Sequence, residues 1–305
     1  MTNDLYPIHV ADLLSKRAEL TPDRVGLLDA ETGVAYTYRQ LNRRANRAAN
    51  YLRGLGIAKG DRVAILAQNS VVYIDLLYGL AKIGAILAPL NWRLTAREMV
   101  YIAADMQAKA IICGPEYSDL LAEVCREVHY PIVISIEGAR IDGALAYEAG
   151  VAAADDAEPE QPPLSAEDIC CLLYTSGTTG RPKGAMLPHR QLLWNCINTV
   201  ISWGLRADDV SPVMTPMFHA GGLFIFLTPL FYVGGKIVLA RSFNSEDSLA
   251  LIQRERCTVV LGVPTLFQMW LNSPSFAMAD FSRVRFFVSG GAPCPLSLIE
   301  AWRAA

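Results

Sequence analysis

The sequence predicts an α/β fold in which helices cover mainly parallel sheets. Short apolar runs alternate with segments of helical periodicity along most of the chain. Several of these runs, such as "AIIC" at 110–113, are continuously apolar, as expected for strands buried on both faces. The chain has 305 residues, 52% of them hydrophobic, which suffices for one large domain or two ordinary ones.

The first predicted helix follows a capping box. Thr37 and Gln40 have the Thr-x-x-Gln spacing, apolar residues then recur every three to four positions, and Gly56 closes the helix. Thr95 and Glu98 form a second capping box. Four strands are predicted in this half of the chain, at 62–69, 85–90, 110–113 and 131–136. Two further helices are predicted, one capped by Ser70 and reaching Lys82, the other around 117–127.

The composition changes between residues 137 and 167. This stretch is rich in Gly, Ala, Pro and acidic residues, as in "AAADDAEPEQPPLSAED". Such a composition is typical of a linker or a surface connection. We therefore expect a subdomain connection near 137–167.

The alternation of strands and helices resumes after this stretch. Strands are predicted at 169–175, 236–240, 257–261 and 284–289. Helices are predicted at 189–203, 246–256 and 264–272, after Gly222, and from Pro295 onward.

Charge and cysteine content exclude several classes of protein. The chain carries 27 basic and 30 acidic residues, a net charge of −3, so it lacks the basic footprint of a nucleic-acid-binding protein. Five arginines are predicted to form the solvated face of one helix: Arg39, Arg43, Arg44, Arg47 and Arg53. The seven cysteines include no CxxC pair, and Cys170 and Cys171 stand in an apolar run that predicts burial. A reducing compartment, the cytoplasm, fits this usage.

No membrane or export segment is expected. The N-terminus lacks the basic start and apolar core of a signal peptide. Residues 210–235 contain no Asp, Glu, Lys or Arg and could span a bilayer by length. Prolines and glycines interrupt this stretch, so it is interpreted as a strand, a loop and a buried helix.

The stretch "ICCLLYTSGTTGRPKGAML" combines an apolar strand with a glycine-rich loop. Gly177, Gly180 and Gly184 are expected to allow positive φ angles and close approach of a ligand to the backbone. Successive backbone N–H groups in such turns bind anions, and Lys183 adds a positive charge. Hydroxyl donors come from Thr175, Ser176, Thr178 and Thr179. Donors and one cation in this arrangement predict a polyphosphate site. The spacing matches neither a Walker loop nor GxGxxG.

The eleven residues "YTSGTTGRPKG" resemble the phosphate loop of the adenylate-forming enzymes, which include acyl-CoA synthetases, aryl-CoA ligases and peptide-synthetase adenylation domains. Other parts of the chain agree with this family in order. They are "YTYRQLN" (36–42), "LAKIGAILAPLNWRLT" (80–95), "PMFHAGG" (216–222) and "VSGGAPCP" (288–295). The resemblance covers about residues 7–305 and implies the parallel-sheet sandwich of the family's N-terminal domain.

The resemblance implies a two-step reaction. A carboxylate attacks the α-phosphate of ATP to give an acyl-adenylate and diphosphate, and coenzyme A then takes the acyl group to give acyl-CoA and AMP. Catalysis in the first step is mostly positioning and charge stabilisation. By resemblance, residues 175–183, with Lys183 as a catalytic cation, hold the β- and γ-phosphates. The segment of Gly290, Gly291, Ala292 and Pro293 lies against the adenine, and Mg²⁺ arrives only with the nucleotide.

The resemblance also implies an acyl pocket. His219 is one of four histidines and lies in the uncharged stretch; its position in "MFHAGG" implies a role beside the reacting carboxylate. The other residues implied for the pocket are Gly221, Gly222, Phe224, Val263 and Pro264. The residues from 221 to 233 include no acid that could hold an amino group, and an apolar pocket favours a fatty or aromatic acid over an amino acid.

The sequence departs from the family at its end. The family's Tyr-Gly-x-Thr-Glu motif, ribose-binding Asp, hinge and mobile C-terminal domain with its lysine do not occur within residues 1–305. We therefore expect a ligase portion that turns over little alone. The alternative is a non-catalytic module that binds acyl groups or nucleotide. Which acid is used, and whether the chain forms a dimer, stay open.

Overall fold

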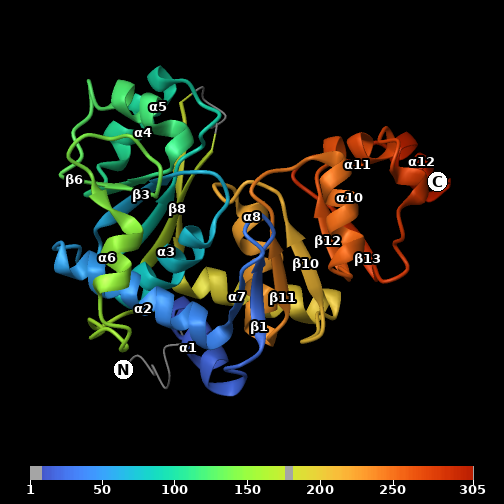
Figure 1. Ribbon diagram of the computed structural model, residues 1–305, viewed down its shortest axis with the longest axis horizontal. Coiled ribbons are helices and arrows are strands. Elements are labelled where there is room, and N and C mark those ends of the chain that lie inside the picture. Colours follow the sequence, from blue (N-terminus) through green and yellow to red (C-terminus); the bar gives the residue numbers. More distant parts are fainter. Residues whose placement is uncertain (1–8, 176–180, 305) are drawn as a thin grey trace. The chain divides into compact units, whose positions relative to one another are not determined.

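The computed structural model describes residues 9–175 and 181–304, and it divides into two compact units. Unit 1 comprises residues 1–20 and 39–194, and unit 2 comprises residues 21–38 and 195–305. The stretch 137–167 lies wholly inside unit 1, so the chain does not divide where its composition changes. Figure 1 shows both units as α/β structures, which confirms the predicted fold class.

Unit 1 is built on a sheet whose described strands follow the order β7-β6-β5-β3-β4-β8-β9. All neighbouring pairs are parallel except β8 and β9, which form an antiparallel hairpin. The strands are β3 (Arg62–Leu66), β4 (Ile86–Pro89), β5 (Ala110–Cys113), β6 (Ile132–Ser135), β7 (Leu145–Ala146), β8 (Ile169–Thr175) and β9 (Lys183–Pro188). The predicted buried strands are thus confirmed, whereas β7 and β9, neither of which has a buried residue, were not predicted.

Helices cover both faces of this sheet. On one face, α4 and α5 pack their apolar residues against β3, β4 and β5 (Figure 1). On the other face lies α3, in which every residue is buried. The described helices of unit 1 are α1 (Val10–Leu20), α2 (Tyr38–Gly54), α3 (Val71–Lys82), α4 (Ala96–Met106), η1 (Pro115–Tyr117), α5 (Ser118–Val124) and α6 (Tyr147–Ala153). Helix α7 (His189–Trp203) passes from unit 1 into unit 2.

Unit 2 contains two smaller sheets, with strand orders β10-β11-β1-β2 and β12-β13 among the described residues. The strands are β1 (Val25–Asp29), β2 (Ala35–Thr37), β10 (Val210–Val213), β11 (Lys236–Leu239), β12 (Val259–Gly262) and β13 (Phe286–Ser289). The helices are α8 (Ala220–Phe224), α9 (Leu227–Val233), α10 (Ser245–Arg254), α11 (Pro264–Leu271), η2 (Phe276–Met278) and α12 (Leu296–Ala304). Strands β1 and β2 were not predicted, whereas β10 is the strand expected within residues 210–235.

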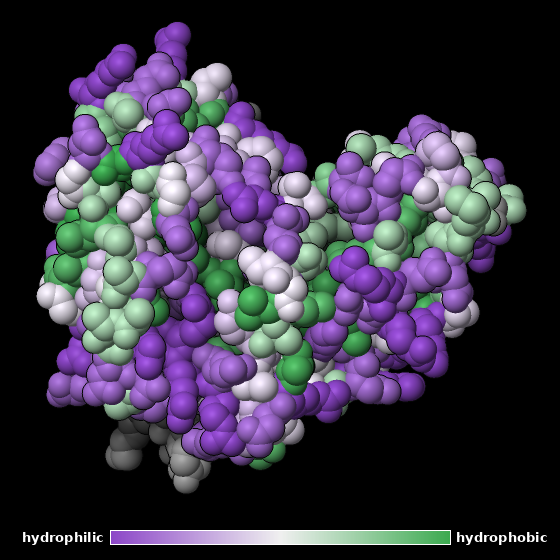
Figure 2. Space-filling view, in the orientation of Figure 1, coloured by the Kyte–Doolittle hydropathy of each residue, from purple (hydrophilic) through white to green (hydrophobic). Residues whose placement is uncertain are grey.

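An aromatic core holds β12, β13 and their helices together. Phe267, Trp270, Phe287 and Trp302 contact one another edge-on or tilted, and the indole N–H of Trp270 donates to Ser248 Oγ at 2.8 Å. Apolar residues also reach the surface of this unit around α12 (Figure 2).

The predictions of helix caps and helix boundaries were confirmed only in part. Thr95 Oγ1 accepts from the Glu98 N–H and the Glu98 carboxylate accepts from the Thr95 N–H, as the capping box requires. Ser70 occupies the N-cap of α3, but its side chain makes no capping bond, which corrects that prediction. The single helix predicted after Gly222 is two short helices, α8 and α9. In the described part of the chain, no helix is long and apolar enough to cross a membrane.

Candidate functional site

The predicted phosphate loop stands on the β8–β9 hairpin of unit 1. Thr175 ends β8, Lys183 begins β9, and the two residues are direct partners in the antiparallel ladder. The Thr175 hydroxyl donates to the Lys183 carbonyl oxygen at 3.5 Å, and both side chains are exposed. The hairpin therefore brings the first and last residues of the predicted loop together. Ser176, Gly177, Thr178, Thr179 and Gly180 lie outside the described residues.

Gly184 has a role other than the one expected. It lies in β9 without a positive φ angle, so the expected left-handed conformation is wrong for this glycine. A Cβ atom at this position would lie 2.9 Å from Leu172 Cδ1 and 3.2 Å from Tyr174 Cζ. The absence of a side chain thus lets the Tyr174 ring lie over the neighbouring strand.

The remaining predicted site residues belong to unit 2, where three segments converge. Gly262 and Ser289 are partners at the carboxyl ends of the parallel strands β12 and β13. The Gly290 N–H donates to the Gly262 carbonyl at 3.1 Å and continues the ladder by one step. Beyond these ends, Val263 caps α11, which starts with Pro264 at a position where proline's missing N–H costs nothing.

Leu261 connects the glycines of two predicted motifs. Its Cδ2 atom lies 3.8 Å from the position of a Cβ on Gly221, and its Cδ1 atom lies 4.0 Å from that of a Cβ on Gly290. A Cβ on Gly291, whose φ is +79°, would be 3.4 Å from Val263 Cγ1. Residues predicted for the acyl pocket and for the adenine segment therefore both lie beside Leu261. Leu261 itself was missed, although it stands two residues before Val263 in an apolar run.

A tight turn positions His219 at the N-cap of α8. The His219 N–H donates to the Pro216 carbonyl at 3.1 Å, and the His219 carbonyl accepts from Gly222 N–H. The imidazole is exposed and contacts the Phe218 ring, with centroids 4.4 Å apart. Gly222 is buried, and a Cβ there would lie 2.5 Å from the Pro216 carbonyl oxygen. Only glycine fits at this position of the turn, so Gly222 has a packing cause.

The other predicted residues of unit 2 differ in exposure. Phe224 is buried, whereas Ala292 and Pro293 are exposed beyond the end of β13. Among the described residues, no group of three or more His, Cys, Asp or Glu side chains is arranged to hold a metal ion. All seven cysteines are free thiols, and Cys170 and Cys171 are fully buried as predicted.

The fold is that of an α/β domain. One unit carries a hairpin whose loop sequence is rich in glycine and hydroxyl residues, and the other carries apolar strand ends followed by glycines. A family model described as "AMP-binding enzyme" matches residues 14–305. The chain belongs to this family.

Curated relatives carry the names of acid–CoA ligases. The chain is 37% identical to a feruloyl-CoA synthase from Amycolatopsis over 94% of its length, and 34% identical to the long-chain-fatty-acid–CoA ligase FadD13 from Mycobacterium tuberculosis over 96%. It spans only 55% and 57% of the lengths of these two relatives.

Solved structures agree with the fold. The N-terminal domain of FACL13 from Mycobacterium tuberculosis, with a bound inhibitor, gives a TM-score of 0.87 at 31% identity and covers 97% of this chain and 73% of that one. The anthranilate–CoA ligase AuaEII in complex with anthranoyl-AMP gives a TM-score of 0.92 at 27% identity, with 98% and 58% covered. The neighbours confirm the predicted N-terminal domain fold of adenylate-forming enzymes.

Proposed function

We propose that this chain activates a carboxylic acid with ATP and passes the acyl group to coenzyme A, forming acyl-CoA, AMP and diphosphate. The single observation that carries the proposal is the hairpin in which Thr175 and Lys183 close a glycine- and hydroxyl-rich loop at the end of a buried strand. Family membership and the names of the relatives support the same reaction class.

In this proposal, the loop from Thr175 to Lys183 holds the β- and γ-phosphates of ATP. Its hydroxyl and backbone donors would bind the phosphate oxygens, and the Lys183 ammonium would offset charge on the departing diphosphate. Mg²⁺ would enter bound to the nucleotide phosphates. His219 would hydrogen-bond near the reacting carboxylate, since its ring is exposed at the N-cap of α8 beside Phe218.

The acid is proposed to be fatty or aromatic. Leu261 and Val263 present apolar atoms beside the backbone of Gly221 and Gly291, and the stretch 210–235 carries no charged side chain that could pair with a polar substrate. Such a lining stabilises an apolar acyl group by burial. The backbone of Gly290 and Gly291 would leave room for the flat adenine.

The test is acid-dependent exchange of labelled diphosphate into ATP, measured in the longest natural polypeptide that contains residues 1–305. A panel of straight-chain fatty, cinnamic-type and benzoic acids addresses the substrate class, and amino acids serve as the negative set. Lys183→Ala should lower the exchange rate at least about a hundredfold, the order found when a charge-stabilising donor is removed. Lys16→Ala is the matched control, because Lys16 is exposed and pairs with Glu19 on the surface.

The outcomes separate the two hypotheses. Exchange with apolar acids that is lost in the Lys183 variant supports the ligase. If the exchange rate is unchanged in the Lys183 variant, the proposed role of the loop in phosphate binding is wrong. Nucleotide or acid binding without exchange for any acid favours the non-catalytic binding module.

A further inference from the structure

Two contacts join α4 to the two limbs of the β8–β9 hairpin. On the outgoing limb, the Tyr174 hydroxyl donates to Asp105 Oδ2 at 2.6 Å. On the returning limb, the Arg181 guanidinium lies over the Tyr101 ring, 5.9 Å from its centroid, within cation–π range. Tyr101 and Asp105 are four residues apart, so they share one face of the helix. Tyr174 directly precedes Thr175, and Arg181 lies two residues before Lys183.

Helix α4 is firmly held in unit 1. Its start is fixed by the Thr95–Glu98 capping box, and Met99, Ile102, Ala103 and Met106 are buried against the sheet. At its end, Arg62 of β3 donates to the Gln107 carbonyl at 3.0 Å. A helix fixed at both ends is a rigid support for side chains on its exposed face.

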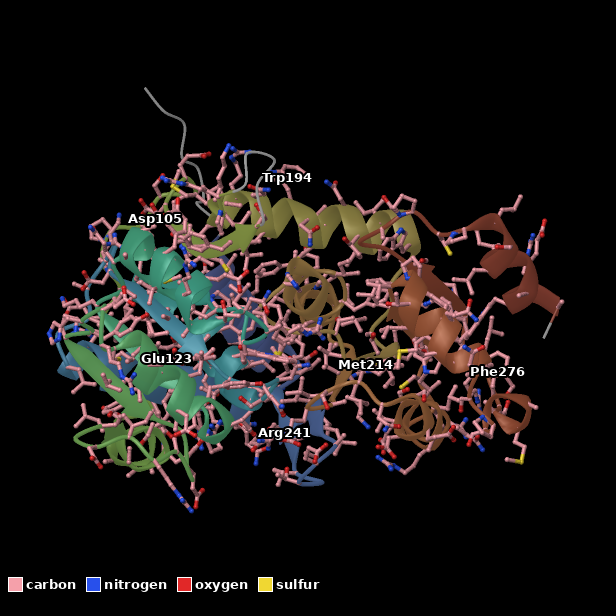
Figure 3. All side chains as sticks on the ribbon, turned by 90° about the horizontal axis from the view of Figure 1, so that it is seen from above. Asp105, Glu123, Trp194, Met214, Arg241 and Phe276 are labelled. Atoms are coloured by element: carbon pink, nitrogen blue, oxygen red, sulfur yellow. The ribbon has the colours of Figure 1, made fainter. Side chains whose placement is uncertain are left out.

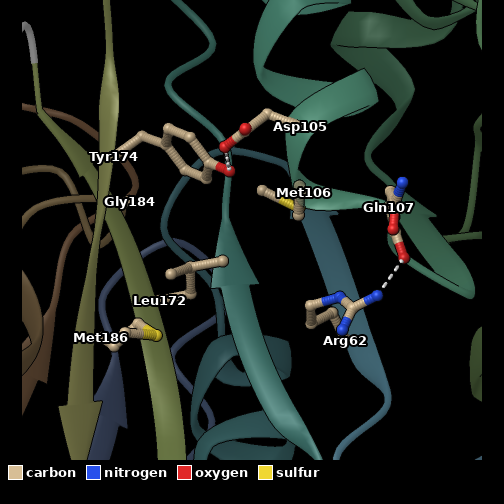
Figure 4. A pocket seen from close by; sticks show the side chains of 8 residues that line it. All are labelled: Arg62, Asp105, Met106, Gln107, Leu172, Tyr174, Gly184 and Met186. Atoms are coloured by element: carbon tan, nitrogen blue, oxygen red, sulfur yellow. Dashed lines mark hydrogen bonds between the residues drawn. The ribbon is translucent and has the colours of Figure 1, made fainter.

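Tyr174 is held by packing against the core of unit 1 and by its bond to Asp105. The ring borders an open cavity of about 250 Å³ that Asp105, Met106 and Gly184 also line, as Figure 4 shows. Asp105 stands in the last turn of α4, where the helix dipole disfavours a carboxylate, and the tyrosine donor compensates that charge. Burial and the adjacent Asp105 carboxylate raise the pKa of Tyr174, so the hydroxyl remains protonated and keeps donating.

We propose that Tyr101 and Asp105 of α4 act as positioning residues that hold both limbs of the hairpin against α4, and so fix the position of the paired Thr175 and Lys183 for polyphosphate binding. The inference rests on the proposed function for its effect on ATP. The contacts themselves do not depend on that function. Asp105 contacts Tyr174 in the stem, and Tyr101 contacts Arg181, two residues before β9 begins. Neither contact requires nucleotide.

The experiment measures two quantities in the natural polypeptide that contains residues 1–305. Amide hydrogen exchange of the peptide spanning residues 172–187 reports on the stem without nucleotide. Acid-dependent exchange of diphosphate reports the KM for ATP and, separately, for the acid. Tyr174→Phe, Asp105→Ala and Tyr101→Leu break the contacts, whereas Asp105→Asn keeps an acceptor and Tyr101→Phe keeps a ring. Glu123→Ala is the control, because Glu123 is an exposed acid near the end of a separate helix, α5 (Figure 3).

We expect the three disrupting variants to speed amide exchange in this peptide and to raise the KM for ATP roughly fivefold, about the loss of one hydrogen bond, with the KM for the acid unchanged. Asp105→Asn and Tyr101→Phe should keep both the amide exchange rate and the KM for ATP close to the values of the parent protein. The effects of Tyr174→Phe and Asp105→Ala should not be additive, because both substitutions remove the same hydrogen bond. Unaltered amide exchange would overturn the proposal. So would an equal rise in both KM values, which indicates general destabilisation. A parent protein without any acid-dependent activity would reject the proposed function, and amide exchange alone would then decide the positioning role.

Discussion

The ammonium of Lys82 lies 2.6 Å from Glu158 Oε2 although Lys82 is completely buried. Ser15 Oγ at 2.7 Å and Asn42 Oδ1 at 2.8 Å complete its surroundings, so each of the three N–H bonds of Lys82 has an acceptor. Glu158 belongs to the stretch whose composition predicted a linker. A buried charge thus ties this stretch to α1, α2 and α3.

Glu158→Ala should lower the free energy of unfolding by about 2 kcal/mol, because it leaves a buried ammonium without its countercharge. The estimate is below that for a fully buried pair, since Glu158 is itself half exposed. Glu160→Ala is the matched control: Glu160 is 88% exposed and pairs with Arg53, so its loss should cost less than about 1 kcal/mol. Urea unfolding measures both values, and equal losses would contradict the anchoring role of Glu158.

Sequence composition could not reveal this anchoring, because the contacts join residues far apart in the chain. Asn46 donates to the Asp156 carbonyl at 2.9 Å, and Arg43 and Arg47 approach the Asp156 carboxylate within 4 Å. The arginine face of α2 was predicted as solvated, and hydrophilic residues do cover this region in Figure 2. Part of that face nevertheless binds the acidic segment. Acids and prolines mark a segment without a regular element, but they do not show what it covers.

Asp75→Ala should destabilise the protein by about 3–5 kcal/mol, the range for removing one partner of a buried ion pair. Asp75 is fully buried; Arg44 donates to it from Nε at 3.1 Å and from Nη2 at 2.6 Å, and Tyr147 donates at 3.2 Å. Asp156→Ala removes a more exposed partner of two arginines and should cost less than about 1 kcal/mol. Thermal unfolding of both variants gives the comparison, and similar midpoints would argue against a buried network.

The candidate site was predicted from the sequence only in part. The motif residues and the strands that carry them followed from apolar periodicity and from glycine content. The contacts of Leu261, Tyr101 and Asp105 did not, because each depends on which strand or helix lies beside it. Gly184 shows the same limit: its composition suggested a turn, whereas the register of β9 on β8 makes it a packing glycine.

Gly222→Ala should destabilise unit 2 by at least about 2 kcal/mol, because the new Cβ would overlap the backbone of Pro216 and Met217 and must displace the His219 turn. Gly221→Ala is the adjacent control. A Cβ there meets Leu261 and Thr215 only at 3.8 and 4.0 Å, which is ordinary contact. Denaturant midpoints distinguish the two substitutions. If both variants were equally stable, the tight packing of Gly222 would not be what fixes the turn.

Protein stability should fall as the pH decreases from about 6.5 to about 4, partly because of His189. Burial, the neighbouring His9 and Lys59 lower the pKa of His189 to about 4, against the opposing effect of Asp168. Its Nδ1 accepts the Val10 N–H at 3.2 Å, and its place at the start of α7 further disfavours a positive charge.

In this pH range the unfolded chain binds a proton that the folded protein excludes, so acid favours unfolding. Titration of this single group lowers the free energy of unfolding by at most roughly 3 kcal/mol at low pH. This destabilisation is absent above about pH 6.5, where His189 is neutral in both the folded and the unfolded state. His189→Asn keeps an acceptor for Val10 and cannot titrate, so its unfolding free energy should change less between pH 7 and pH 4.5. Urea unfolding at both pH values measures this slope directly. Identical slopes in parent and variant would mean that His189 is not the group responsible.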